Sequence, residues 1–358
     1  MKFGQFEVFR WHQDVTDSDS INRVMEKIEF GDEIGLDEIW IAEHHFSRHG
    51  LVSGIFSLLG NVAARTTRAR IGTAVVVLPF HHPIQVAEEA ATIDILSGGR
   101  LSLGVGAGYQ RQEFEGLGVD IEEGRRRFRE YIEVIQGAWA PDPLTYKGDF
   151  IDVQDVNVIP KPLQPGGIPI QVAVTTSPES IDFAASKGLQ IMVGGPTAVM
   201  GQVPEIIRHW HDRMEHYGHP HQNIDLAVGM SIYVAPTMEE AESDLVGLED
   251  VINEEFRRVG NPKDASGNVP ESYRHWANRE QERSGLAKGA REQGILPLIG
   301  TPEVIIERIE GLKALGINSI RGTFGAAGLD QGKTLRSMRM FAEEVMPHFA
   351  EEGVLTGE

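Results

Sequence analysis

Short apolar runs alternate with longer amphipathic stretches along most of the chain. Short runs rich in Val, Ile and other apolar residues predict β-strands, whereas apolar residues spaced three and four positions apart predict α-helices. The predicted strands are Lys2–Val8, Glu38–Ala42, Ala69–Val77, Arg100–Gly106, Ile168–Val174, Gln190–Val193, Ala227–Val234 and Asn318–Thr323. The predicted helices are Ile21–Ile34, Ser53–Arg65, Pro83–Leu96, Gly124–Trp139, Pro178–Ser186, Val203–Tyr217, Met238–Val259, Pro302–Leu315 and Leu335–Phe349.

This alternation defines an α/β fold. Strands separated by helices pair in parallel through right-handed crossovers, and eight such units close into a (β/α)8 TIM barrel. Several of the predicted strands are continuously apolar, as expected of strands that are covered on both faces. An open doubly wound sheet is the second interpretation. We expect residues 1–358 to form a single domain.

Two segments interrupt the alternation. Between about residues 141 and 165, Lys147-Gly148-Asp149 joins two strand-like pieces, which predicts a hairpin excursion. Between about residues 260 and 298 the chain is polar, with one predicted helix at Ser272–Leu286. A long insertion before the last barrel unit is typical of a lid over an active site, and the second interpretation is a passive surface elaboration.

Composition narrows the class of protein. The 358 residues are 41% hydrophobic and contain no cysteine, which excludes disulfides, thiolate metal sites and cysteine nucleophiles. The formal net charge of -20 argues against nucleic acid as a partner. We see neither a secretory signal nor an apolar run of membrane-spanning length, so we expect a soluble cytoplasmic protein without a membrane partner.

The chemistry is predicted at the carboxyl end of the second strand. Glu43, His44 and His45 follow its apolar run directly. In a parallel barrel the catalytic groups lie in the loops that follow the strands, and histidine changes charge near neutral pH. These three residues are therefore our candidate catalytic group. The competing interpretation is an ordinary surface loop.

Three features could hold a phosphate at the same end of the barrel. The first is Val174-Thr175-Thr176-Ser177, which opens a helix after the fifth strand, although Ser177 could simply cap that helix. The second is the cluster Arg125-Arg126-Arg127 with Arg129 at the start of the long fourth helix, Gly124–Trp139, which could instead be a solvated face paired with glutamates. The third is the glycine-rich turn Gly322–Gly328, which lacks a dinucleotide fingerprint.

Other catalytic constellations are missing from the sequence. The His44-His45 pair lacks the spacing of a helical zinc site. The histidines after residue 208 cluster on and after one amphipathic helix, where a solvated face is the favoured interpretation, and we predict no metal. There is no Gly-x-Ser-x-Gly nucleophile elbow. The small residues around Gly106 would let a flat ring lie against the top of the barrel. A proton-transferring histidine and a phosphate grip without a nucleophile are typical of proteins whose cofactor carries the chemistry.

The chain also resembles the bacterial luciferase-like flavin monooxygenases from its first residue to its last helix. The blocks that carry the resemblance are Met1-Lys2-Phe3-Gly4, Ile41-Ala42-Glu43-His44-His45-Phe46, Gly72-Thr73-Ala74-Val75-Val76-Val77-Leu78-Pro79, His82-Pro83, Gly98-Gly99-Arg100 and Val345-Met346-Pro347. The resemblance implies a (β/α)8 barrel that binds reduced FMN at its mouth. FMN and O2 would form a C4a-hydroperoxide that oxygenates a small organic substrate.

The resemblance also assigns roles to residues. His44 matches the family's catalytic histidine, with His45 and Glu43 expected to orient it. Ala74-Val75 matches a non-proline cis peptide beneath the flavin ring. The expected cofactor-binding residues are Ala74, Val75, Gly106, Arg125, Val174, Thr175, Thr176 and Ser177.

Further expectations concern partners and alternatives. Because we find no NAD(P)H fingerprint, a separate NAD(P)H:flavin reductase would supply the reduced FMN. The resemblance implies a homodimer through the predicted helices Ser53–Arg65 and Pro83–Leu96, and small residues at Gly106 and Gly194-Gly195 favour a non-luminous member. Two alternatives stay open: an F420-dependent oxidoreductase that transfers hydride on the same barrel, and a non-catalytic flavin-binding protein.

Overall fold

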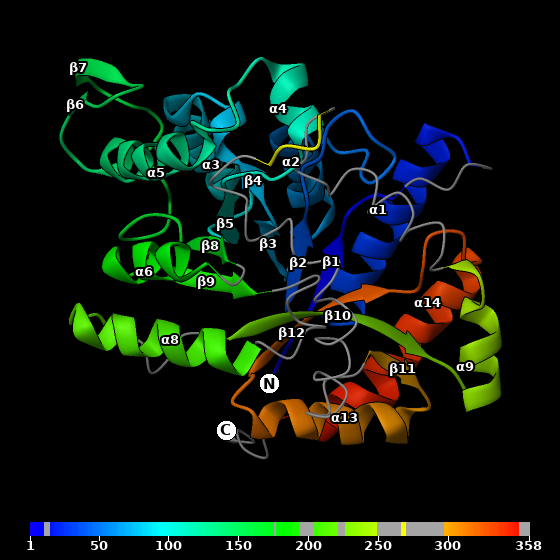
Figure 1. The fold of residues 1–358 in the computed structure, drawn as a ribbon. Helices are drawn as coiled ribbons and strands as arrows, with labels where there is room; N and C mark the ends of the chain where they lie inside the picture. The colour runs from blue at the N-terminus through cyan, green and yellow to red at the C-terminus, as the bar shows by residue number, and fades with distance from the viewer. Residues whose placement is uncertain are drawn as a thin grey trace, which may run out of the picture.

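A closed ring of parallel strands forms the centre of the molecule (Figure 1). The structure is a computed structural model and describes residues 1–10, 15–174, 177–193, 203–220, 226–248, 266–269 and 297–350. Within these residues, eight strands pair in the order β1-β2-β3-β5-β8-β9-β10-β12, and β12 pairs with β1 to close the barrel. The ring strands are β1 Lys2–Glu7, β2 Glu38–Ile41, β3 Arg70–Thr73, β5 Leu101–Gly106, β8 Ile170–Val174, β9 Gln190–Val193, β10 Ala227–Val234 and β12 Ser319–Phe324.

Helices surround the ring and cover its outer face (Figure 1). They follow the predicted positions closely because their apolar faces are regular; in α5, Phe128, Ile132 and Ile135 lie on one buried stripe. The helices are α1 Asp17–Glu33, α2 Ile55–Arg65, α3 Pro83–Leu96, α4 Arg111–Leu117, α5 Gly124–Trp139, α6 Pro178–Ser186, α8 Val203–His216, α9 Met238–Leu245, α13 Pro302–Ala314 and α14 Gln331–Met340. Among the described residues, no helix is long and apolar enough to cross a membrane.

The predicted barrel is confirmed, and so is the hairpin excursion. Strands β6 Leu144–Lys147 and β7 Asp152–Val156 pair antiparallel outside the ring. All four residues of β2 and all six of β5 are buried, which explains why these strands read as continuous apolar runs. Pro83 and Pro302 stand at the first positions of α3 and α13, as predicted.

Several boundaries differ from the prediction. The expected strand Ala69–Val77 is split into β3 and β4 Val76–Val77, with a turn at residues 74 and 75. A short strand that we did not predict, β11 Leu298–Gly300, pairs with β10 outside the closed ring. The first helix starts at Asp17 rather than Ile21, because the Thr16 side chain accepts the N–H of Asp19 and caps it.

Three helix predictions need further correction. No helix was predicted between the strand Arg100–Gly106 and the helix Gly124–Trp139, but α4 lies there. The last predicted helix begins earlier, at Gln331, and continues after Met340 as a π-helical turn, Phe341–Val345, and a 3-10 turn, Met346–Phe349. The α9 helix ends at Leu245 within the described residues. The predicted helix Ser272–Leu286 and most of the insertion 260–298 lie outside them.

Candidate active site

The loop that leaves strand β2 folds back sharply on itself. The His44 N–H donates to the Val52 carbonyl at 2.9 Å, and Phe46 adopts a left-handed conformation with φ of 57°. Gly50 lies so close to His44 that a Cβ there would approach His44 Cδ2 to 3.0 Å. This return brings the His49 ring to 4.7 Å from the His44 ring. The His44 side chain is thus held in a buried corner at the carboxyl end of β2, where the sequence predicted it.

The carboxylate that holds His44 is Glu113, on the unpredicted helix α4. His44 Nδ1 lies 3.1 Å from Glu113 Oε1, which also accepts the His45 peptide N–H at 2.9 Å. The Glu113 side chain is almost fully buried, at 1% exposure. Gln110 adds a further contact, its Nε2 lying 3.1 Å from the same nitrogen. Sequence reasoning missed both residues, although Arg111–Leu117 contains several good helix formers that could have indicated α4.

The Glu43 carboxylate lies between two other histidines, His45 and His81. Its Oε1 atom accepts from His45 Nε2 at 2.8 Å and from His81 Nε2 at 2.7 Å, and its Oε2 accepts the Val77 N–H at 2.9 Å. Burial opposes ionisation, but the two imidazoles and the peptide N–H outweigh it and hold the pKa of Glu43 below its usual value. Glu43 therefore binds His45 and His81, and its expected role in orienting His44 stays a prediction.

The pKa values of two histidines in this region, His81 and His49, shift in opposite directions. Burial works against a charge on His81, but hydrogen bonding and attraction from Glu43 prevail and raise the pKa of His81. For His49, burial and then the charges of His44 and Arg10 lower the pKa to about 2. His49 is therefore neutral at physiological pH, and its ring lies beside that of His44.

Strands β3, β4 and β5 supply a floor of small residues next to this group. The Ala74–Val75 peptide bond is cis, as the resemblance implied. Both residues are half-buried, in contrast with the fully buried strand residues on either side. Gly106, at the end of β5, packs so tightly that a Cβ there would meet Val75 Cγ2 at 2.7 Å. That these residues lie beneath a flavin ring stays a prediction.

Arg125 and Ser177 come together across the space between α5 and α6. Arg125 Nη1 donates to Ser177 Oγ at 3.4 Å, and Val174 is buried at the end of the preceding strand. Ser177 is the N-cap residue of α6 but makes no side-chain capping bond; its hydroxyl donates to Glu179 Oε2 at 2.7 Å. The simple capping interpretation is therefore wrong. Thr175 and Thr176 lie outside the described residues.

The other arginines of the cluster face away from this contact. Arg126 is exposed and pairs with Asp149, and Arg127 binds Glu123 at 2.8 Å. Arg129 is exposed and lies over the Phe183 ring. The solvated interpretation holds for the exposed Arg126 and Arg129, whereas Arg127 is half-buried over the Phe150 ring. Arg125 alone among the four has a described contact with Ser177.

A small aromatic cluster lies beside His44 and reaches the insertion. The rings of His44 and Tyr109 are 6.3 Å apart, and Phe80 stacks edge-on against Phe114 at 4.8 Å. Val269, from the short described piece of the insertion, packs against this cluster. In Figure 1 this piece, drawn in yellow, runs beside α4. The insertion thus reaches the side of the barrel that carries the candidate catalytic residues.

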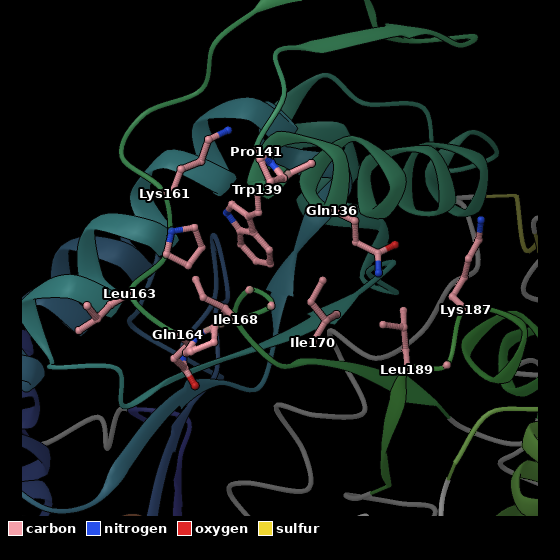
Figure 2. Close-up of a pocket in the computed structure, with 16 residues that line it drawn as sticks. Gln136, Trp139, Pro141, Lys161, Leu163, Gln164, Ile168, Ile170, Lys187 and Leu189 are labelled. Carbon is pink, nitrogen blue, oxygen red and sulfur yellow. The ribbon is translucent and has the colours of Figure 1, made fainter.

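A hollow lies at the opposite end of the barrel from the candidate site. It has a volume of about 620 Å³ and is lined by residues that precede β8 and β9, including Ile168 and Leu189. Figure 2 shows Trp139 projecting between Lys161 and Gln136. Since catalytic groups of such barrels lie at the carboxyl ends of the strands, this hollow is not part of the candidate site. Among the described residues, no group of three His, Asp or Glu is placed to bind a metal ion.

Comparison with known proteins assigns the family. The model of the luciferase-like monooxygenase family matches residues 1–319, and the chain belongs to this family. It is 30% identical to 4-hydroxyprotoasukamycin monooxygenase of Streptomyces nodosus subsp. asukaensis, over 92% of this chain and 87% of that protein. It is 26% identical to the oxygenase component of flavin-dependent trigonelline monooxygenase from Acinetobacter baylyi, over 99% and 97% of the two chains.

Solved structures support the fold. Monooxygenase RslO1 from Streptomyces bottropensis superposes with a TM-score of 0.83 at 24% identity, covering 98% of this chain and 100% of that one. The coenzyme F420-dependent tetrahydromethanopterin reductase of Methanopyrus kandleri superposes with a TM-score of 0.67 at 17% identity, covering 97% and 99%. Similarity at these identities establishes the barrel and leaves the cofactor open.

Proposed function

We propose that this protein is a flavin-dependent monooxygenase that uses reduced FMN and O2 to oxygenate a small organic substrate. Family membership and the monooxygenase relatives support the reaction class. The observation that carries the proposal is the buried His44–Glu113 contact beside the half-buried Ala74 and Val75 at the barrel mouth. When bound, reduced FMN would supply the activation of O2.

The residues at the mouth fit such a cofactor. Arg125 and the Ser177 hydroxyl provide donors for a phosphate at the N-terminus of α6, where the helix dipole favours an anion. Ala74, Val75 and Gly106 would leave room for the flat ring. Val174, Thr175 and Thr176 complete the set of residues proposed to hold FMN. The charge of Glu179 opposes a phosphate there.

His44 would manage protons in the reaction. A carboxylate at Nδ1 favours the tautomer with a proton on that nitrogen, so that Nε2 of the neutral ring is left as a base. The Gln110 amide donates to Nδ1 only when that nitrogen carries no proton. The two partners together support both tautomers, which suits a group that must take a proton and return it.

The remaining residues would organise the site. Glu43 ties His45 and His81 to the peptide of Val77, and so fixes the end of β2 against β4. The aromatic cluster with Val269 would help to exclude water from the mouth. We further propose a cytoplasmic homodimer supplied with reduced FMN by a separate NAD(P)H:flavin reductase; the relative described as an oxygenase component supports the separate reductase.

One rapid-mixing experiment tests the proposal. Photoreduced FMN is mixed anaerobically with the protein and then with oxygenated buffer, and absorbance is recorded over time. We expect a long-lived species whose spectrum differs from those of both reduced and oxidised FMN. Direct reoxidation at the rate of free flavin would contradict the proposal.

The F420-dependent structural relative makes hydride transfer the second candidate. Anaerobic titration with F420 and with FMN separates the two functions, because tight binding of F420 without a response to FMN would establish the alternative. A third outcome would indicate a non-catalytic binding protein. In that outcome the protein binds flavin but bound flavin reacts with O2 at the rate of free flavin, and His44→Ala gives the same rate as the parent.

A further inference from the structure

The Ser177 hydroxyl at the start of α6 is already fully engaged. It accepts from Arg125 Nη1 at 3.4 Å and from the Ser180 hydroxyl at 3.3 Å, and it donates to Glu179 Oε2 at 2.7 Å. A hydroxyl has one proton and can donate one hydrogen bond at a time. Any phosphate that binds Ser177 through this proton must therefore displace the Glu179 carboxylate.

Charge adds to this competition. Glu179 is exposed in the first turn of α6, where a carboxylate stabilises the helix by interacting with its dipole. The same position places a negative charge beside the donors proposed to bind the phosphate, and like charges at this range repel. The Glu179 carboxylate thus accepts the hydrogen bond that the phosphate would need and repels the phosphate charge.

From these contacts we infer that Glu179 is a specificity-determining residue that weakens the binding of FMN through its phosphate. This inference rests on the proposed function. Reduced FMN delivered by a separate reductase must both bind and leave. When the phosphate leaves, the Glu179 carboxylate can accept the hydrogen bond of the Ser177 hydroxyl in its place. Glu179 acts on the phosphate and has no effect on the flavin ring.

Comparing FMN with riboflavin isolates this role, because the two differ only in the phosphate. Equilibrium dialysis under anaerobic conditions gives the dissociation constants of photoreduced FMN and riboflavin for the parent and for Glu179→Gln. Removing the charge should tighten FMN binding about tenfold, by an amount that shrinks as salt is added, and should leave riboflavin binding unchanged.

The chain offers a matched control. Helix α13 opens with Thr301-Pro302-Glu303, the same order of residue types as Ser177-Pro178-Glu179. Glu303 is also exposed, and its side chain is hydrogen-bonded to Thr301. Glu303→Gln makes the same change in net charge and in helix-dipole interaction, far along the sequence from Arg125. It should alter neither dissociation constant.

The outcomes are distinct. Equal FMN affinity of Glu179→Gln and parent, weaker FMN binding, or a parallel change for riboflavin would overturn the role of Glu179 and leave the proposed function standing. Failure of the parent to bind either flavin would instead overturn the proposed function. Thermal melting of each variant checks folding, and Ser177→Ala, which removes the contested proton, should reduce the effect of Glu179→Gln.

Discussion

His44 Nδ1 and Glu113 Oε1 lie 3.1 Å apart, and both side chains are buried. They come from the loop after β2 and from helix α4, separated by 69 positions in sequence. A buried carboxylate at one imidazole nitrogen fixes the orientation of the ring and stabilises its protonated form. We therefore propose that Glu113 is a positioning residue that acts through His44.

Glu113→Gln should slow the reaction and spare the binding of flavin. The amide keeps the size of the side chain but loses the carboxylate charge beside His44 Nδ1. We expect the rate of the oxygen-dependent step to fall about 10- to 100-fold, with the FMN dissociation constant within twofold of the parent. Stopped-flow absorbance and anaerobic dialysis measure the two quantities. Glu115→Gln, an exposed neighbour on the same helix, is the control; equal rates for the two variants would remove Glu113 from the mechanism.

The effects of Glu113 and His44 should not add. His44→Ala is expected to leave flavin binding nearly intact and to slow oxygenation, because the proton-transferring group is gone. If Glu113 acts only through His44, then the double variant His44→Ala/Glu113→Gln reacts at the rate of His44→Ala. Stopped-flow rates for the four proteins of this cycle provide the measurement. A further loss in the double variant would indicate an independent role for Glu113.

The barrel was predictable because its signal is repeated along the chain. Strand β5 is buried along its whole length and helix α5 has a regular apolar face, so local pattern and global fold agree there. The misses are short elements. β11 has three residues and α4 has seven, and neither is long enough for its periodicity to emerge.

The site was predictable only in part, for a physical reason. His44 and Arg125 could be found because each stands in a local pattern, a strand end or a helix start. The partners of His44 and of Glu43 could not, since Glu113 and His81 reach them through tertiary contacts from 69 and 38 positions away. The direction of the Ser177 hydroxyl, toward Glu179 rather than the helix backbone, likewise depends on the packing around it.

Arg125→Ala should weaken the binding of FMN far more than it affects folding. Arg125 is half-buried and contacts Ser177, and loss of a charge-assisted hydrogen bond to a phosphate typically lowers affinity about 10- to 100-fold. Riboflavin, which lacks the phosphate, should bind both proteins equally. Arg126→Ala, at the next position and paired with Asp149 on the surface, serves as the control in the same dialysis experiment. An FMN affinity equal to that of the control would contradict the assignment.

Gly106→Ala should impair the binding of FMN and riboflavin alike. The added Cβ would lie 2.7 Å from Val75 Cγ2, and the β-branched Val75 cannot move away by simple rotation. We expect a loss of about 1–3 kcal/mol in the free energy of unfolding, together with weaker binding of both flavins. Gly60→Ala in α2 makes the same chemical change where a Cβ meets nothing within 4 Å, and should be neutral or stabilising. Urea unfolding and dialysis compare the two; unchanged flavin binding in Gly106→Ala would exclude this floor from the site.

His49 should make the fold sensitive to acid. Burial, with the nearby His44 and Arg10, lowers the pKa of His49 to about 2 from 6.5 in the unfolded chain. Because its folded pKa is the lower one, its contribution to stability is fully present above pH 6.5 and is lost progressively as the pH falls toward 2. Between pH 6.5 and about 5 the loss amounts to at most about 2 kcal/mol. His49→Gln cannot titrate, so the difference between its urea midpoints at about pH 7.5 and about pH 5 should be smaller than that of the parent. The exposed His82→Gln, which changes a histidine without this burial, should keep the parent's acid sensitivity, and equal behaviour of the two variants would refute the effect.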